Sequence, residues 1–441
     1  MEIQFLDTAE NPLDVAVSSA RTCYSAKGII TPQDSTNWKR KEKLLLDLFK
    51  SGHHTTLQHT HITMMISGVS RHLIWRLLHS HNFYISEQIS QRYAKMKLEN
   101  VYLSESGNSE KWNEFYQKRF GEYEKLTEIL TEHFQKTLPK FQRKSANKKA
   151  MEIARYVLPQ GVTATLYHTV NILTLLRYIS VAKTLPESRN EAMRFAEILK
   201  SKLIQLDPIF EKLIEVVKKE KTSFPENDFS QFDNLGKVFD LIGNFDFETE
   251  NYSTVLRNSQ MLHDTGILGG VSTISKISLS ADAQNQRHRR SLGIRQKLET
   301  DFQKDFYIPT VFKENSESME IYQNSMNEIY KFFDEQKDEI GFSDSVYALP
   351  NSHLVKIVER SDLSSFQHKT QMRLCYNAQE EIWQETYDQV KDIREKNISG
   401  SQKLLPPCTL RFAEKKFPLC PEGDRFCGVK VWKLDFSQLK R

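Results

Sequence analysis

The sequence has few cysteines and no long apolar run. Five cysteines in 441 residues are too sparse for the disulfide framework of a small secreted domain, so we expect a reducing, cytoplasmic setting. No apolar stretch approaches the roughly 18 residues of a membrane span, and we expect no membrane partner. The first residues carry neither the basic nor the apolar segment of a signal peptide.

The sequence also has little net charge. Its 61 lysines and arginines face 57 aspartates and glutamates, which gives +4. This balance is too even to indicate a concentrated basic face, so we expect no nucleic-acid partner. Hydrophobic residues make up 39% of the chain and charged residues 27%, as in globular proteins. The length favours two or more domains.

Periodic patterns predict an α+β fold with long helices and small sheets. Apolar residues recur at helical spacing over 111–138, 189–218 and 319–333. Clusters of β-branched and apolar residues at 2–6 and 61–67 predict short strands.

Residues from about 398 onward combine turn residues, two adjacent prolines and three cysteines, which predicts an irregular C-terminal extension. Cys408, Cys420 and Cys427 lie twelve and seven positions apart. They lack the paired Cys-x2–4-Cys spacing and the fourth ligand that zinc prefers. We therefore expect buried thiols or a redox pair here rather than a metal site.

The two halves of the chain repeat the same series of features. Each has an Arg- and His-rich polar segment, a long amphipathic helix and a Leu-Pro pair. The pairs are Leu158-Pro159 and Leu349-Pro350. We predict a first repeat at 1–221, a linker at 222–236, a second repeat at 237–397 and the extension at 398–441.

The repeats carry motifs that are similar to those of the flavin-dependent thymidylate synthase family. The first half contains SEQISQRY at 86–93 and ARYVLPQGVTATLYHTVN at 154–171. These resemble the family's Ser-x-Arg-Tyr and Ala-Arg-x-x-Leu-Pro segments. The second half contains QNQRHR at 284–289, which matches the family's Gln-x-x-Arg-His-Arg. It also has Arg373 at 23 residues past the Leu-Pro proline, followed by AQEEI at 378–382.

Each repeat lacks what the other keeps. The first has Ser80-His81-Asn82 where the family has Arg-His-Arg, and Ala182 where it has the late arginine. The second has Lys297 and Glu299 at the Ser-x-Arg positions, and Val346 before Leu-Pro. Members of the family are homotetramers with active sites between subunits. The resemblance therefore implies a tandem fusion that keeps one set of composite sites, and a homodimer that mimics the tetramer.

The resemblance implies FAD as the cofactor and dUMP, methylenetetrahydrofolate and NADPH as partners in making dTMP. Arginine suits phosphate and carbonyl oxygens because it is a permanently charged donor fork. The implied catalytic residues are Arg373 and Ser90. The implied substrate-binding residues are Gln88, Ser90, Gln91, Arg92, Arg155, Gln284, Arg287 and Arg373. The implied cofactor-binding residues are His59, Asn171, Arg287, His288, Arg289 and Gln379.

Other interpretations stay open at this stage. The tetrapeptide at 287–290 could be a solvated basic helix face, and His59 could be a capping or core residue. Gln88 stands where the family has an acidic residue, so the substrate could be another pyrimidine nucleotide. The number of lost family residues also fits a non-catalytic protein that binds flavin or nucleotide.

Overall fold

The structure is a computed structural model that describes all residues except 27, 220–228, 247–268, 301 and 441. The chain forms two compact units, each assembled from three segments. Unit 1 comprises Met1–Phe120, Leu158–Pro225 and Glu328–Leu349. Unit 2 comprises Gly121–Val157, Glu226–Asn327 and Pro350–Arg441.

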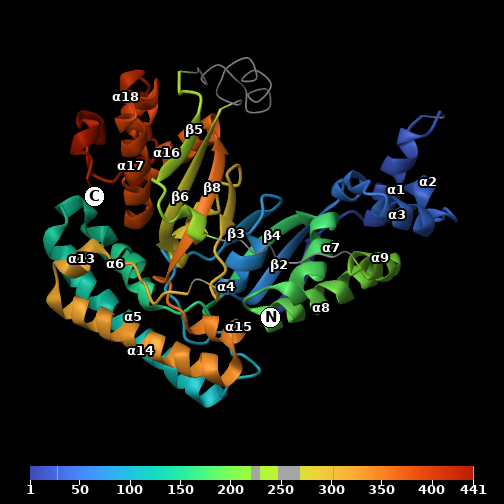
Figure 1. The fold of residues 1–441 in the computed structure, drawn as a ribbon, viewed down its shortest axis with the longest axis horizontal. Coiled ribbons are helices and arrows are strands. Elements are labelled where there is room, and N and C mark those ends of the chain that lie inside the picture. The colour runs from blue at the N-terminus through green and yellow to red at the C-terminus, as the bar shows by residue number, and fades with distance from the viewer. Residues whose placement is uncertain (27, 220–228, 247–268, 301, 441) are drawn as a thin grey trace. The chain divides into compact units, whose positions relative to one another are not determined.

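Unit 1 contains a four-stranded antiparallel sheet in the order β1-β2-β4-β3 (Figure 1). Its strands are β1 (Glu2–Asp7), β2 (His61–Ser70), β3 (Ile85–Gln88) and β4 (Thr163–Asn171). Alternate side chains of β2, at Ile62, Met64 and Ile66, are fully buried, as expected for a strand with one face on the core. The strands predicted at 2–6 and 61–67 are confirmed.

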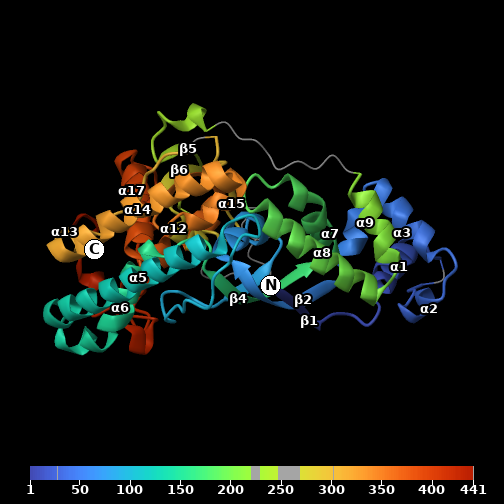
Figure 2. The same ribbon diagram turned by 90° about the horizontal axis from the view of Figure 1, so that it is seen from below.

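Helices pack on this sheet and extend beyond it. The helices α7 (Ile172–Val181) and α8 (Arg189–Leu206) contact β4 and β1, respectively. Helices α1 (Pro12–Cys23), α2 (Gln33–Thr36), α3 (Lys41–Lys50) and α9 (Ile209–Val217) form an adjoining cluster, in which α9 lies beside α3 (Figure 2).

The helical spacing predicted over 189–218 is confirmed, but it belongs to two separate helices, α8 and α9. The break lies at Asp207-Pro208. Proline has no N–H to continue the hydrogen bonds of α8 and is favoured at the start of a helix. The Asp207 carboxylate accepts a hydrogen bond from the backbone N–H of Ile209 at 2.9 Å, which starts α9.

Unit 2 repeats the topology of unit 1, with a sheet in the order β5-β6-β8-β7. Its strands are β5 (Val238–Ile242), β6 (Gly270–Ser278), β7 (Leu292–Arg295) and β8 (Leu354–Asp362). Helices α16 (Leu363–Arg373) and α17 (Glu380–Glu395) contact this sheet as α7 and α8 contact the first. The shared strand order supports the interpretation of the chain as two copies of one domain.

The long helices predicted near 111–138 and 319–333 are confirmed as α5 (Ser109–Thr137) and α14 (Ser316–Ile340). Each of them crosses from one unit into the other. Within unit 1, Phe115 of α5 stacks on Phe332 of α14, with ring centroids 4.2 Å apart. Within unit 2, Ser325 donates a hydrogen bond to Glu122 at 2.7 Å. Each unit thus includes a helical segment from the other sequence repeat.

Short helices complete both units: α4 (Arg71–Leu73), α6 (Ala146–Ala154), α12 (Leu279–Asn285), α13 (Thr310–Lys313), α15 (Phe342–Ser345) and α18 (Pro407–Ala413). The α+β class and the two repeated domains are confirmed. The predicted repeat boundaries remain predictions. In the linker predicted at 222–236, residues 222–228 lie outside the described part, and Ser230–Phe232 forms a 3-10 turn.

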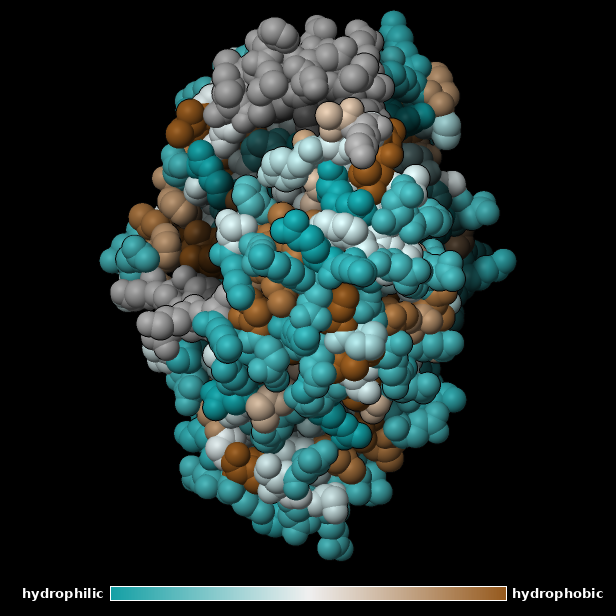
Figure 3. All heavy atoms as spheres, turned by 90° about the vertical axis from the view of Figure 1, so that its right-hand side faces the viewer, coloured by the Kyte–Doolittle hydropathy of each residue, from teal (hydrophilic) through white to brown (hydrophobic). Residues whose placement is uncertain are grey.

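The C-terminal extension is irregular, as predicted, and is anchored by a few apolar side chains. Leu404, Val431 and Leu439 are buried with Trp383 of α17 in the core of unit 2. The face of the molecule in Figure 3 shows apolar side chains spread among hydrophilic ones. Among the described helices, none combines the length and apolar character needed to cross a bilayer.

Candidate active site

A buried carboxylate in unit 2 fixes the helix that carries the Gln-x-x-Arg-His-Arg motif. Strand β6 ends at Ser278, whose hydroxyl caps α12 by accepting from the backbone N–H of Ala281 at 3.0 Å. The carboxylate of Glu381 accepts hydrogen bonds from the Ser278 N–H at 2.5 Å and from its hydroxyl at 2.6 Å. Burial raises the pKa of Glu381 to about 7, although these hydrogen bonds oppose the shift.

Tyr156 connects this carboxylate to residues of the first repeat. Its hydroxyl donates to Glu381 at 2.8 Å and also meets the side-chain amide of Gln379. Burial raises the pKa of Tyr156 well above its ordinary value, so the phenol stays protonated as a donor. Tyr156 directly precedes the Val157-Leu158-Pro159 segment and directly follows Arg155. The position of Arg155 is therefore coupled to the helix start at Ser278.

Arg155 and two glutamines form one hydrogen-bonded group in unit 2. The Arg155 guanidinium donates to the Gln379 side-chain oxygen at 2.7 Å. The Gln284 side chain, on α12, donates to the same oxygen. Arg155 is 5% exposed and Gln379 1% exposed. The structure thus places a first-repeat arginine against the two second-repeat glutamines that the motifs predicted.

Arg373 and His288 adjoin this group. Arg373 ends α16, and its guanidinium donates to the backbone carbonyl of Gln284 at 2.5 Å. The pKa of His288 falls to about 2, chiefly because of burial and then because of the positive charges of Arg373 and Lys369. His288 is therefore neutral at physiological pH. Of its neighbours in the motif, Arg287 is exposed and Arg289 half-buried.

The remaining predicted residues lie in unit 1. The Ser90 hydroxyl accepts from the Arg92 backbone N–H at 3.2 Å, which folds the Ser-x-Arg segment into a turn. The Arg92 guanidinium lies 5.3 Å from the centre of the Tyr93 ring. Gln88 is half-buried on β3, Gln91 is buried, and His59 is exposed after a short 3-10 turn.

Asn171 has a structural role that was not predicted. Its side-chain oxygen accepts from the backbone N–H of Thr174 at 2.9 Å, so it caps the start of α7. Asp362 caps α16 in the same way, with the Ser365 N–H at 2.7 Å. The exchange of Asn for Asp between the repeats is therefore a change between two good helix caps. Its predicted cofactor role remains a prediction.

Unit 1 repeats the carboxylate arrangement but fills the adjoining space differently. Glu191 accepts from the Ser70 N–H at 2.8 Å, from the Ser70 hydroxyl at 2.5 Å and from the Tyr347 hydroxyl at 3.0 Å. Burial raises its pKa to about 7, as for Glu381. Arg76 lies six residues after Ser70. In unit 2, Gln284 lies six residues after Ser278.

Arg76 forms a closed ion pair with Glu187 in unit 1. The guanidinium donates to both carboxylate oxygens, at 2.6 and 3.1 Å, and both side chains are almost fully buried. An arginine held by a buried carboxylate has its charge already balanced. The second-repeat helix that reaches unit 1 contributes Val346, which is fully buried, where unit 2 has Arg155.

Comparison with known proteins agrees with these motifs. The family model "Thymidylate synthase complementing protein" matches residues 4–208 and 271–396, which together make up more than half of the chain. The chain belongs to this family. Two separate matches in one chain correspond to the two sheets of equal topology, so the chain is a tandem fusion of two domains of the family.

Two curated relatives and one solved structure illustrate the similarity. The flavin-dependent thymidylate synthase of Clostridium tetani is 28% identical over 40% of this chain and 72% of its own length. That of Kosmotoga olearia is 26% identical over 42% of this chain and 80% of its own. The structure of thymidylate synthase X from Helicobacter pylori with FAD and dUMP has 22% identity and a TM-score of 0.34, covering 50% of this chain and all of that one.

A π-helical turn distinguishes the first domain from the second near the position of the Arg-His-Arg motif. Residues Ile74–Leu78 form this turn, directly after α4. The second domain has the regular α12 at this point. A π turn holds one extra residue compared with an α turn. The insertion shifts Ser80-His81-Asn82 by one position relative to Ser70, although their spacing to Ser90 is retained.

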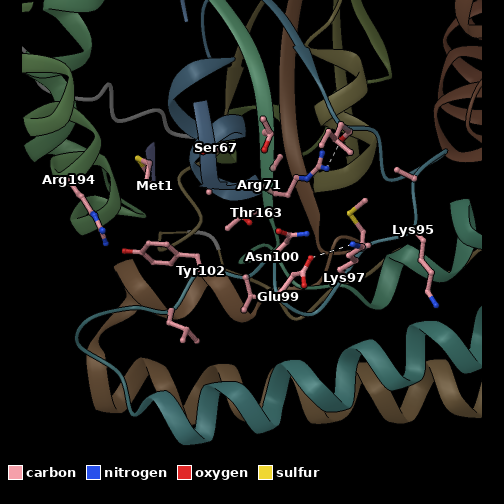
Figure 4. Close-up of a pocket in the computed structure, with 18 residues that line it drawn as sticks. Met1, Ser67, Arg71, Lys95, Lys97, Glu99, Asn100, Tyr102, Thr163 and Arg194 are labelled. Atoms are coloured by element: carbon pink, nitrogen blue, oxygen red, sulfur yellow. Dashed lines mark hydrogen bonds and ion pairs between the residues drawn. The ribbon is translucent and has the colours of Figure 1, made fainter. Parts of the chain in front are cut away.

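Unit 1 also contains a cavity of about 640 Å³ that the sequence did not predict. It lies beside the Ser-x-Arg segment, with Ile89 and Ala94 in its lining. Figure 4 shows Arg71, Lys95 and Arg194 among the residues around it. Arg71, Lys95, Lys97 and Arg194 contribute positive charge, and Lys97 lies 3.5 Å from Glu99. The Arg71 guanidinium donates to the Ile89 carbonyl at 2.7 Å, which ties β2's end to the Ser-x-Arg segment.

Sequence reasoning missed Tyr156 and Glu381, which hold the predicted arginine and glutamines in place. Both stand inside motifs that were recognised, directly after Arg155 and in the AQEEI segment. Tyr156 and Glu381 lie 225 positions apart in sequence. The available signal was that both residues recur in the other repeat. Tyr347 follows Val346 as Tyr156 follows Arg155, and Glu191 corresponds to Glu381.

Proposed function

We propose that the chain is a flavin-dependent thymidylate synthase, which converts dUMP to dTMP with methylenetetrahydrofolate as methyl donor and NADPH as reductant. The observation that carries this proposal is the group of Arg155, Gln284, Gln379 and Arg373 in unit 2. It combines one residue of the first repeat with three of the second. The names of both curated relatives agree with the proposal.

The substrate side of the proposal rests on the chemistry of this group. Arg155 presents a guanidinium that Gln379 orients through one of its donors, and Arg287 is exposed on the same motif. Both suit the dianionic phosphate and the sugar of a nucleotide. Gln284 and Gln379 present amide donors and acceptors, which suit the carbonyl and N–H groups of uracil.

The residues of unit 2 also fit FAD. Arg287 and Arg289 are cationic donors, and a neutral His288 offers one donor and one acceptor nitrogen. This set matches the negative phosphates and the polar edge of a flavin. When bound, the flavin supplies the hydride chemistry, and the protein orients and shields it.

In this proposal Arg373 activates the pyrimidine. Its guanidinium is held by the Gln284 carbonyl and carries a permanent positive charge. Placed at a uracil carbonyl oxygen, that charge stabilises the enolate that makes C5 nucleophilic. No covalent protein nucleophile is needed for this step. Tyr156 and Glu381 act as positioning residues. Glu381 contacts Tyr156, which directly follows Arg155, and it also contacts Ser278 at the start of α12.

The first-repeat residues Ser90, Arg92, Gln88 and Gln91 are proposed to complete the nucleotide pocket, from the same chain or from a second copy. The turn at Ser90 holds the Ser90 hydroxyl close to Arg92, and a hydroxyl and a guanidinium both suit a phosphate. His59 and Asn171 are proposed to adjoin the flavin, which for Asn171 would be in addition to its role as a cap.

The proposed assembly is a homodimer. Unit 1 exposes Ile85 of β3 (61% exposed) and unit 2 exposes Leu292 of β7 (65% exposed). These apolar side chains occupy matching edge strands of the two sheets, and exposed apolar edges are typical of interfaces. The proposed compartment is a reducing cytoplasm, in keeping with five cysteines that form no disulfide.

The test is NADPH oxidation by the purified, FAD-supplemented protein in the presence of methylenetetrahydrofolate, with and without dUMP. We expect oxidation that depends on dUMP, formation of dTMP and rescue of a thymidine auxotroph. A protein that binds FAD but shows no turnover with dUMP would contradict the proposal. Because Gln88 replaces an acidic residue, competition with uridine and cytidine monophosphates tests the alternative substrates.

A further inference from the structure

Four of the five cysteines gather at one corner of unit 2. Cys375 lies two residues after the end of α16, whereas Cys408, Cys420 and Cys427 belong to the C-terminal extension. All four are partly buried and none forms a disulfide. The fifth, Cys23, is exposed at the end of α1 in unit 1.

Hydrogen bonds and apolar contacts hold the four segments together. The Asn377 side chain donates to the Arg425 carbonyl at 2.6 Å, which joins the turn after Cys375 to the turn before Cys427. Arg411 of α18 donates to the Pro418 carbonyl at 2.7 Å, which joins the helix of Cys408 to the segment of Cys420. Cys408 and Cys427 both pack against the Trp383 core.

The four thiols lie close enough to interact electrostatically. Cys408 interacts with Cys375, Cys427 and Cys420, and Cys375 also interacts with Cys427 and Cys420. The four side chains therefore form one group, although their segments are separate in sequence.

From this convergence we propose that Cys375, Cys408, Cys420 and Cys427 are the four ligands of a thiolate-bound metal centre. Such a centre would secure an extension that has little regular structure and few buried apolar side chains. Cys375 supplies the fourth ligand that the extension alone lacks. The site is separate from the nucleotide group, although Cys375 stands only two residues after Arg373.

The arrangement of the thiols fits an iron–sulfur cluster better than a single zinc ion. A zinc ion needs four sulfurs at about 2.3 Å from one point. In the described residues, no three His, Cys, Asp or Glu side chains are placed to share one ion. In a four-iron cluster each cysteine binds a different iron, so the thiolates lie farther apart.

The test measures iron, zinc and acid-labile sulfide in full-length protein purified with and without oxygen. We expect about four irons and four sulfides per chain from the anaerobic preparation, and loss of both in the Cys408→Ser and Cys427→Ser variants. Cys23→Ser is the matched control and should keep the full metal content. One zinc per chain would support the four-thiolate site and overturn the cluster assignment.

A second measurement does not depend on the folding of the variants. In native wild-type protein, a thiol reagent should modify only Cys23, and all five cysteines should react after acid releases the metal. The proposal is overturned if neither metal is present in either preparation, or if all five cysteines react in the native protein. Equal metal loss in Cys23→Ser and Cys408→Ser would also overturn it.

Discussion

Replacement of Arg155 by alanine tests the contribution of the first repeat to the nucleotide site. Arg155 is almost fully buried and donates to Gln379 at 2.7 Å. Its Nε also donates to the Glu152 carbonyl at 3.1 Å. A hydrogen bond from a charged group contributes about 1.5–3 kcal/mol. Since about 1.4 kcal/mol corresponds to a tenfold change, Arg155→Ala should weaken dUMP binding roughly ten- to a hundredfold.

Calorimetric titration with dUMP and with deoxyuridine shows whether this loss comes from the phosphate. If Arg155 contacts the phosphate, the variant should lose affinity for dUMP and keep its weaker affinity for deoxyuridine. Arg155→Lys should fall between wild type and alanine, because it keeps the charge and loses the planar donor fork.

Arg189 offers a matched control for this experiment. It stands two residues before Glu191, as Gln379 stands two residues before Glu381, and it is exposed in unit 1. Arg189→Ala should leave dUMP affinity unchanged. An Arg155→Ala protein that is folded and binds dUMP within about twofold of wild type would refute the role assigned to Arg155.

Three further predictions follow from the same contacts. Arg92→Ala and Arg373→Ala should each weaken dUMP binding about ten- to a hundredfold and combine non-additively in a double-mutant cycle, with exposed Glu299→Ala as a neutral control; additive effects would contradict a shared ligand. Glu381→Ala should lower the denaturation midpoint in urea, because it leaves buried donors of Ser278 and Tyr156 unmatched at about 1–3 kcal/mol; an unchanged midpoint would count against that network. Burial lowers the pKa of His168 and of His353 to about 3, so only the unfolded chain takes up these protons between about pH 6.5 and 3. The stability that comes with their neutral form is present above pH 6.5 and is lost on acidification. His353→Phe should therefore reduce the loss of stability measured from pH 7 to 5. The raised pKa values of Glu191 and Glu381 change stability with pH in the opposite direction.

The sequence motifs could name candidate site residues because they stand at fixed distances from local structure. Gln284 lies six residues past a helix cap, and Arg155 lies just before a Leu-Pro pair. The motifs named Arg155, Gln284 and Arg373 as substrate-binding residues and Gln379 as a cofactor-binding residue, and the structure brings these four side chains together. The helix caps were also accessible, since Asn171 directly precedes an apolar helical pattern, which is a recognised start signal.

What the sequence could not predict depends on contacts between distant segments. The hydrogen bond from Tyr156 to Glu381 requires that a helical segment of one repeat join the unit of the other. The break between α8 and α9 required giving Pro208 more weight than the continuing apolar periodicity. Cys375 lies 33 residues before Cys408, so the group of four cysteines was visible only after folding.

The central claim is that each chain keeps one nucleotide site, built from both repeats. Its most direct test is calorimetric titration of FAD-loaded protein with dUMP, in wild type and in Arg155→Ala and Gln284→Ala variants. We predict about one dUMP per chain, and weakening by either variant, although the two residues come from different repeats. Two equivalent sites per chain, or full binding after loss of either residue, would contradict the claim.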